Sequence, residues 1–181
     1  MSDWAATRDW LNERGFAARD ATLWTEALTH GSLGEKRDYQ RLEFLGDRVL
    51  GLAIAQWLFD TQHADAEGKL AQRLNALVSK GACARVARKI GVPDHVRLGR
   101  QARDDGAADS DNILGDVMES LLGAQMCEAG FESARTLIHQ LWADDVEGDA
   151  GRAKHPKSAL QEWAAGNRRR PPEYALVDRS G

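Results

Sequence analysis

The sequence has 181 residues, of which 43% are hydrophobic and 29% charged, and its formal net charge is −4. These values describe an ordinary soluble globular protein that can bury one good core, with room for one domain and a small appendage. The longest nearly apolar run, GLAIAQWLF, is far too short to span a bilayer, and the start MSDWAATRDWLNERG lacks the basic and apolar regions of a secretory signal. Cys83 and Cys127 lack metal-ligand spacing, and we expect both to be reduced, buried residues of a cytoplasmic protein.

Charge is distributed unevenly along the chain. Residues 151–181 hold seven Lys and Arg residues against three acids, whereas residues 1–150 hold 17 against 25. This asymmetry predicts an acidic body with a basic C-terminal appendage. A site built from several carboxylates would give such a body, although an excess of surface Glu and Asp explains it equally well.

Helical patterns fill most of the chain, and short Gly-bearing turns such as RGF, HGSLG and EAGF separate them. The predicted helices span residues 3–14, 22–30, 39–60, 68–90, 111–128 and 132–146. Residues 98–110 are polar and predict a loop, and VEGDAGRAKHP has the composition of a linker. Beyond it, residues 156–166 have a helical pattern and residues 173–177 have the pattern of a strand. The main body is therefore predicted to be all-α.

Two acids interrupt the apolar face of the helix predicted from residue 39. At about 100° per residue, Glu43 and Asp47 fall on the stripe that Leu50, Ile54 and Leu58 continue. A surface helix normally keeps its carboxylates on the face opposite its leucines. This placement therefore requires an explanation.

A second acid pair lies in DNILGDVMESLLGAQM, residues 111–126. Asp116 and Glu119 are three residues apart and share a face with Ser120 and Gly123, whose small side chains allow another helix to approach closely. If the two acid-bearing helices pack together, four carboxylates converge. They cannot all stay ionised in a dry pocket, so either several bind protons or a divalent cation gathers them. Oxygen ligands favour Mg²⁺ or Mn²⁺ over zinc.

Other interpretations of these acids, and of a His and a Ser elsewhere in the sequence, were compared with a divalent-cation site. A single acid pair on a helix is usually solvated or paired with Lys or Arg, and two pairs on apolar helices make that account weaker. A di-iron bundle needs Glu-x-x-His pairs, but Gly46 and Leu122 occupy the third positions after Glu43 and Glu119. The motif LTHGS contains a His and a Ser but no nucleophile elbow, so the end of a helix is its simpler interpretation.

The motif RLEFLGDRVL resembles the signature of the ribonuclease III family of double-strand-specific endoribonucleases. The resemblance continues through ALTHGS (27–32), AEG (66–68) and ILGDVMESLLGA (113–124), in the family's order and at similar separations. The tail KHPKSALQEWAAGNRRRPPEYALVDRSG resembles the beginning of a double-stranded-RNA-binding domain. The resemblance implies an all-α ribonuclease III-type catalytic domain (1–148), a linker (149–155) and an incomplete α+β double-stranded-RNA-binding domain (156–181).

The resemblance also implies roles for individual residues. The metal-site acids would be Glu43, Asp47, Asp116 and Glu119, with Asp47 and Glu119 also catalytic. Further implied roles are an accessory acid at Glu67, a dimer-interface aromatic at Phe44 and RNA contacts at Gln161 and Glu162. For Phe44, a plain core phenylalanine is the alternative. Gln40 departs from the family, which usually has Glu at this position.

The activity that the resemblance implies is Mg²⁺-dependent hydrolysis of phosphodiester bonds in double-stranded RNA, with Mn²⁺ as a substitute and no organic cofactor. The family's homodimer leaves staggered ends with 5′-phosphate and 3′-hydroxyl groups, and it processes precursors of ribosomal RNA and structured messenger- and transfer-RNA precursors. A non-catalytic duplex-RNA-binding protein on the same fold is the main alternative. A helical interaction module that binds no divalent metal is a third.

Overall fold

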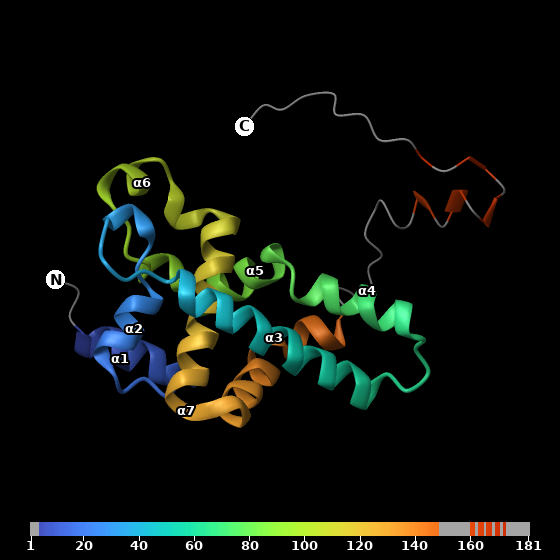
Figure 1. Ribbon diagram of the computed structural model, residues 1–181, viewed down its shortest axis with the longest axis horizontal. Helices are drawn as coiled ribbons and strands as arrows, with labels where there is room; N and C mark the ends of the chain where they lie inside the picture. Colours follow the sequence, from blue (N-terminus) through green and yellow to red (C-terminus); the bar gives the residue numbers. More distant parts are fainter. Residues whose placement is uncertain are drawn as a thin grey trace.

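The computed structural model describes residues 4–148 together with residues 160, 161, 163, 164, 166, 167, 169, 170 and 172. Its helices are α1 (Trp4–Glu13), α2 (Ala21–Ala27), α3 (Gln40–Thr61), α4 (Glu67–Leu77), α5 (Lys80–Ile90), α6 (Arg100–Asp104) and α7 (Asp111–Glu147), with 3-10 turns at Gly31–Leu33, Val92–Asp94 and Ala107–Asp109 (Figure 1). In this described part, β pairing is limited to one isolated bridge between Thr29 and Arg97. The prediction of an all-α body is confirmed.

The two acid-bearing helices, α3 and α7, cross near the middle of the molecule (Figure 1). Helix α7 is kinked at Gly130, where φ 79° and ψ 173° break it into two helical parts. A residue with a side chain rarely adopts such a positive φ, which explains why glycine occupies this position. The predicted break between residues 128 and 132 is therefore confirmed.

The prediction of one helix over residues 68–90 is wrong, because the chain forms α4 and α5 with a break between them. Ser79 adopts an extended conformation at the break, and its Oγ accepts a hydrogen bond from the backbone N–H of Ala82 at 3.3 Å. Serine is a strong N-cap, and its side chain competes with the helical backbone for hydrogen bonds. The apolar periodicity continues through the break and so conceals it.

Two other local predictions need correction. Residues 98–110, predicted as a loop, contain the short helix α6 and a 3-10 turn. Cys83 is buried as expected, but Cys127 is exposed. Cys127 lies on the outer side of α7, three residues before the Gly130 break.

The core lies between α3, α5 and α7 and is closed at one end by α1 and α2. Trp24 and Trp142 are fully buried, and the indole N–H of Trp142 donates to the carbonyl of Leu77 at 3.0 Å. The indole of Trp10 donates to the carbonyl of Ile90 at 2.9 Å and so connects α1 to the end of α5. Each buried indole thus has a polar partner, as its desolvation requires.

The described part of the chain has no helix with both the length and the apolar character needed to cross a bilayer. The predicted linker (149–155) and the predicted strand (173–177) lie outside the described residues. Residues 160, 161, 163, 164 and 166 are helical, in agreement with the prediction for 156–166 as far as that segment is described.

Candidate active site

The crossing of α3 over α7 depends on two glycines. A Cβ added to Gly46 would lie inside the carbonyl group of Glu119, at 2.6 Å from its carbon, and a Cβ added to Gly123 would lie 2.9 Å from the carbonyl carbon of Leu42. No side chain fits at either position, so the two backbones touch. Gly46 follows Glu43 by three residues and Gly123 follows Glu119 by four. The closest contact therefore involves the backbone of Glu119 itself, and on α3 it lies about one turn from Glu43.

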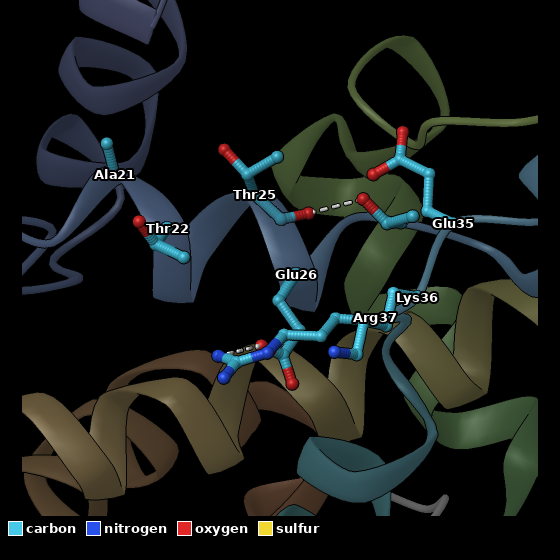
Figure 2. A pocket seen from close by; sticks show the side chains of 8 residues that line it. Ala21, Thr22, Thr25, Glu26, Glu35, Lys36 and Arg37 are labelled. Atoms are coloured by element: carbon cyan, nitrogen blue, oxygen red, sulfur yellow. Dashed lines mark hydrogen bonds and ion pairs between the residues drawn. The ribbon is translucent and has the colours of Figure 1, made fainter.

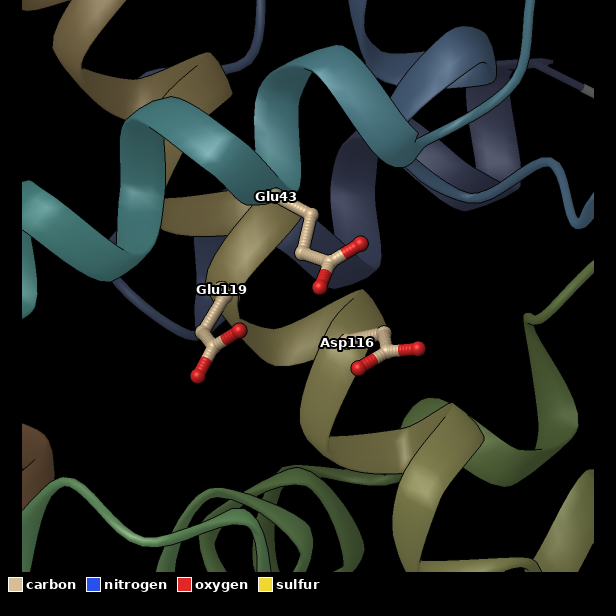
Figure 3. Close-up of side chains that lie close together, drawn as sticks. All are labelled: Glu43, Asp116 and Glu119. Carbon is tan, nitrogen blue, oxygen red and sulfur yellow. The ribbon is translucent and has the colours of Figure 1, made fainter.

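Three carboxylates meet beside this crossing. Each of Glu43, Asp116 and Glu119 offers an oxygen that lies within 4.8 Å of those offered by the other two. Figure 3 shows the side chain of Glu43 descending from α3 toward α7, the helix that carries Asp116 and Glu119. The exposed fractions of their side chains are 29% for Glu43, 22% for Asp116 and 4% for Glu119. The cluster is thus open on one side and buried at Glu119.

Lys80, the first residue of α5, contacts all three acids. Its Nζ lies 2.8 Å from Oε2 of Glu119 and 3.3 Å from Oε1 of Glu43, and it also forms an ion pair with Oδ1 of Asp116. Burial lowers the pKa of Lys80, but its hydrogen bonds to Asp116 and Glu119 outweigh this effect and raise the pKa above its ordinary value. The ammonium group is therefore held in its charged form.

The environment of Glu119 opposes ionisation, in contrast to that of Lys80. Burial raises the pKa of Glu119, the hydrogen bond and charge of Lys80 partly offset this, and the negative charges of Asp47 and Glu43 raise it further. Cys83 is buried next to it, with Sγ 3.8 Å from Oε1 of Glu119. A carboxylate in such surroundings binds a cation strongly, because the cation removes the cost of burying negative charge.

Tyr39 holds the third acid in place. Its hydroxyl donates to Oδ2 of Asp116 at 3.2 Å, and the residue is only 5% exposed. Burial and the neighbouring charge of Asp116 raise the pKa of Tyr39, so its hydroxyl remains a hydrogen-bond donor. Groups that orient a ligand in this way are a regular part of metal centres.

Asp47 does not belong to the group of three. It follows Glu43 by one turn of α3, but its side chain is 44% exposed and its Oδ2 accepts a hydrogen bond from Arg48 at 2.8 Å. The structure therefore brings together three of the four acids expected to converge. The negative charge of Asp47 still contributes to raising the pKa of Glu119, so it lies near the cluster without joining it.

The remaining predicted residues that the structure describes lie at the surface. Glu67 is exposed at the first position of α4, and Gln40 is exposed at the first position of α3. Gln161 is exposed in the short helical stretch, and Glu162 lies outside the described residues. Phe44 is 64% exposed, which excludes the alternative of a core phenylalanine.

Sequence reasoning missed Lys80 and Tyr39. Lys80 is separated from Glu43 and Glu119 by 37 and 39 residues, and no spacing rule links residues so far apart. The one local signal is its position after Ser79, at the first position of a helix, where the helix dipole disfavours a cation. A lysine at this position indicates that acids from elsewhere in the fold offset its unfavourable interaction with the helix dipole.

A separate hollow of about 500 Å³ lies beside α2 and the segment that follows it (Figure 2). It is lined by Ala21, Thr22, Thr25, Glu26, Thr29, Glu35, Lys36 and Arg37. Arg37 pairs with Glu26 at 3.5 Å, and the Thr29 hydroxyl donates to the Thr25 carbonyl at 2.6 Å. Its charged groups are thus already partly paired with each other, and the three clustered acids do not line it.

The fold and the cluster together define an all-helical domain with an acidic centre at the crossing of two helices. Its ligand set fits a hard divalent cation, because it consists of carboxylate oxygens gathered within reach of one ion and already surrounding a positive charge. Residues 20–146 match the family described as Ribonuclease-III-like. The chain belongs to the ribonuclease III family, a family of metal-dependent endoribonucleases.

Curated relatives and solved structures agree with this assignment. Ribonuclease 3 of Zymomonas mobilis is 57% identical over 173 residues, which cover 95% of this chain and 70% of the relative. Ribonuclease 3 of Rhodobacter capsulatus is 48% identical over 157 residues, covering 86% of this chain and 69% of the relative. The nuclease domain of ribonuclease III from Campylobacter jejuni superposes with a TM-score of 0.73 at 32% identity, covering 77% of this chain and 95% of that one.

Proposed function

We propose that the chain hydrolyses phosphodiester bonds within double-stranded RNA in a reaction that requires Mg²⁺, with Mn²⁺ as a substitute. The observation that supports this most directly is the convergence of Glu43, Asp116 and Glu119 at the crossing of α3 and α7. When bound, the cation would supply positive charge for the phosphoryl oxygens and would make water a better nucleophile. No organic cofactor is needed for such a hydrolysis.

The chain's own residues then divide the work. Glu43, Asp116 and Glu119 hold the cation, and the Tyr39 hydroxyl keeps Asp116 turned toward it. Asp47 completes the acid set by leaving Arg48, at little cost because an exposed ion pair contributes only about 0–1 kcal/mol. In this proposal Asp47 and Glu119 are the catalytic acids that orient the attacking water, one of which takes up the proton that the water loses, and Glu67 is an accessory acid.

Assembly as a homodimer is supported by an apolar stripe on α3. Phe44, Leu52 and Phe59 are 64%, 58% and 72% exposed, and at about 100° per residue they fall within about 80° of one another. A second copy of the chain would cover this stripe. One solved relative, the Campylobacter jejuni nuclease domain, is described as having a flexible region involved in dimer formation.

Two active centres in such a dimer would each cut one strand and leave staggered ends with 5′-phosphate and 3′-hydroxyl groups. A duplex is read by its shape, since the deep and narrow major groove of A-form RNA hides the bases. Precursors of ribosomal RNA and structured messenger- and transfer-RNA precursors are the proposed substrates. The basic segment 156–181, joined by the linker 149–155 to the catalytic domain 1–148, would add RNA contacts through Gln161 and Glu162.

The test is cleavage of a long RNA duplex with and without Mg²⁺. The wild type should cut the duplex only with the metal, and Glu119→Gln should lose cleavage because it removes the negative charge of the most buried ligand. Glu132→Gln is the matched control, since Glu132 also lies on α7 but is 75% exposed and pairs with Arg135. Full activity of Glu119→Gln would refute the site. Binding of duplex RNA by the wild type without any cleavage would favour the non-catalytic alternative.

A further inference from the structure

The centre of the carboxylate cluster holds a cation that belongs to the chain. The ammonium group of Lys80 contacts Glu43 on α3 and both Asp116 and Glu119 on α7. In the described part of the chain, the ion pairs of these three acids are all made with Lys80. A single lysine thus lies among the three acids that Figure 3 shows.

The position of Lys80 is built into the fold. A Cβ at residue 115 would lie 2.9 Å from Cδ of Lys80 and 3.1 Å from its carbonyl oxygen, so Gly115 on α7 leaves the space in which the lysine lies. Ser79 caps α5 immediately before it and fixes where the helix begins. A lysine free in solvent would need neither a glycine beneath it nor a fixed helix start.

The position of Lys80 at the start of α5 is electrostatically unfavourable within that helix. A cation at the first position of a helix faces the positive end of the helix dipole and is destabilised there. The three acids therefore supply the attraction that keeps the ammonium group in place. The same acids would be left with unbalanced negative charge, one of them buried, if the lysine were removed.

A divalent cation and this ammonium group cannot share the centre. Carboxylate oxygens approach Mg²⁺ to about 2.0–2.1 Å, so an ion bound by these three acids would take the space between them. Nζ of Lys80, at 2.8 Å from Glu119, already lies in that space. Two cations so close together would repel each other strongly in a partly buried site.

We infer that Lys80 is the resident counterion of the metal-free centre and that a divalent cation binds by displacing its ammonium group into solvent. The lysine then stabilises the acid cluster when no metal is present and weakens the first binding of metal. The side chain is 41% exposed, so it has a route outward without any movement of the backbone. This inference rests on the proposed function, because it takes the cluster as the divalent-cation site.

The test measures metal binding and stability in the whole 181-residue chain without RNA. Lys80→Met keeps the apolar stem and removes the charge. Isothermal titration with Mg²⁺ should show binding at least about tenfold tighter than in the wild type, since no ammonium group has to leave. The metal-free variant should melt at a lower temperature than the wild type, and saturating Mg²⁺ should abolish this difference.

Two further variants separate this effect from a general loss of positive charge. Lys89→Met removes another lysine of α5, one that is 59% exposed and pairs with Asp144, and it should leave the Mg²⁺ affinity unchanged. Lys80→Arg retains the charge and should return the affinity toward the wild-type value. Each of these results supports the counterion role.

The outcomes also distinguish the inference from the function on which it rests. Mg²⁺ affinity of Lys80→Met equal to or weaker than that of a wild type that binds metal and cleaves RNA would overturn the inference and leave the function standing. Cleavage that persists without metal, or after Glu119→Gln, would overturn the proposed function itself.

Discussion

Replacing Gly46 by alanine tests whether the contact between α3 and α7 determines both the stability and the geometry of the site. The added Cβ would lie 2.6 Å from the carbonyl carbon of Glu119 and 2.8 Å from the backbone nitrogen of Gly123. Ordinary contacts of this kind begin at about 3.4 Å, and the carbonyl oxygen of Glu119 would lie closer still than its carbon, so the helices must separate by more than about 0.8 Å. Neither neighbouring atom can turn aside, because both belong to the backbone of α7.

The separation has a calculable cost. A gap of about 0.5–1 Å forfeits roughly a quarter to a half of each dispersion contact across the interface. Overpacking of a core typically costs about 1–3 kcal/mol and sometimes more, and this clash is with backbone, which places its cost at about 3–4 kcal/mol. Against this, alanine gains up to about 1 kcal/mol over glycine in helix propensity. We expect a net loss of about 2–3 kcal/mol in the free energy of unfolding.

The same displacement moves Glu43 away from Glu119, because one acid is on each helix. A misplacement of about 1 Å at a reacting centre can lower a rate about 100-fold. Urea denaturation gives the stability, and duplex cleavage under folding conditions gives the activity. Gly68→Ala is the matched control, because Gly68 lies in α4 with nothing within 4 Å of an added Cβ. It should leave cleavage nearly unchanged and should raise stability by no more than the gain of about 1 kcal/mol in helix propensity.

Equal stability and equal cleavage for Gly46→Ala and Gly68→Ala would refute this reasoning. It would mean that the two helices can separate without loss, and that the position of the acids does not depend on their contact. A loss of stability with full activity would refute only the claim that the contact between the helices determines the position of the acids.

Three further predictions follow from other contacts. Phe44→Ala should weaken the proposed dimer by up to about 3–5 kcal/mol, which is the cost of deleting a buried Phe. An association constant that is unchanged in sedimentation equilibrium would show that Phe44 is not part of the interface. Tyr39→Phe should lower cleavage about 10- to 100-fold at limiting Mg²⁺, because Asp116 loses its hydrogen bond, and wild-type metal dependence would argue against this orienting role. Burial raises the pKa of Glu128, but hydrogen bonds from two backbone amides and the Trp24 indole outweigh it and lower the pKa. Its ionised form therefore stabilises the fold at neutral pH by about 1 kcal/mol, and the stability difference between wild type and Glu128→Gln should shrink as the pH falls below 4.

The sequence contained the main helices and the acids of the site because both are local patterns. The apolar stripe of α3 continues through Glu43 and Asp47, and that interruption is visible without any structure. The break between α4 and α5 was missed because a capping serine, and not a change of periodicity, produces it. Local hydrogen-bond chemistry overrode the hydrophobic pattern at that point.

The parts of the site that could not be predicted depend on tertiary position. The partnership of Lys80 with acids 37 and 39 residues away exists only once α5 lies against α7. Asp47 shares the helical stripe of Glu43, yet its side chain turns to Arg48. The helical periodicity predicts the position of each Cβ on the helix surface. The rotamer of the side chain and the nearest opposite charge then determine where its carboxylate lies.

The glycines that let α3 and α7 touch also account for the acids beside the crossing. Gly46 and Gly123 bring the backbones of α3 and α7 together, and Glu43 and Glu119 each precede their glycine by about one turn. Because the two backbones touch, glutamate side chains from both helices are long enough to reach one ion. Helices packed through leucines would have their axes about 8–10 Å apart, which is the ordinary separation. Carboxylates on an apolar face are therefore tolerated here because the close crossing supplies each of them with a shared cation, Lys80 in the metal-free protein and a divalent ion in the proposed enzyme. A leucine-rich crossing with the same acids would leave them buried and unpaired, and it would be expected to expel them to solvent.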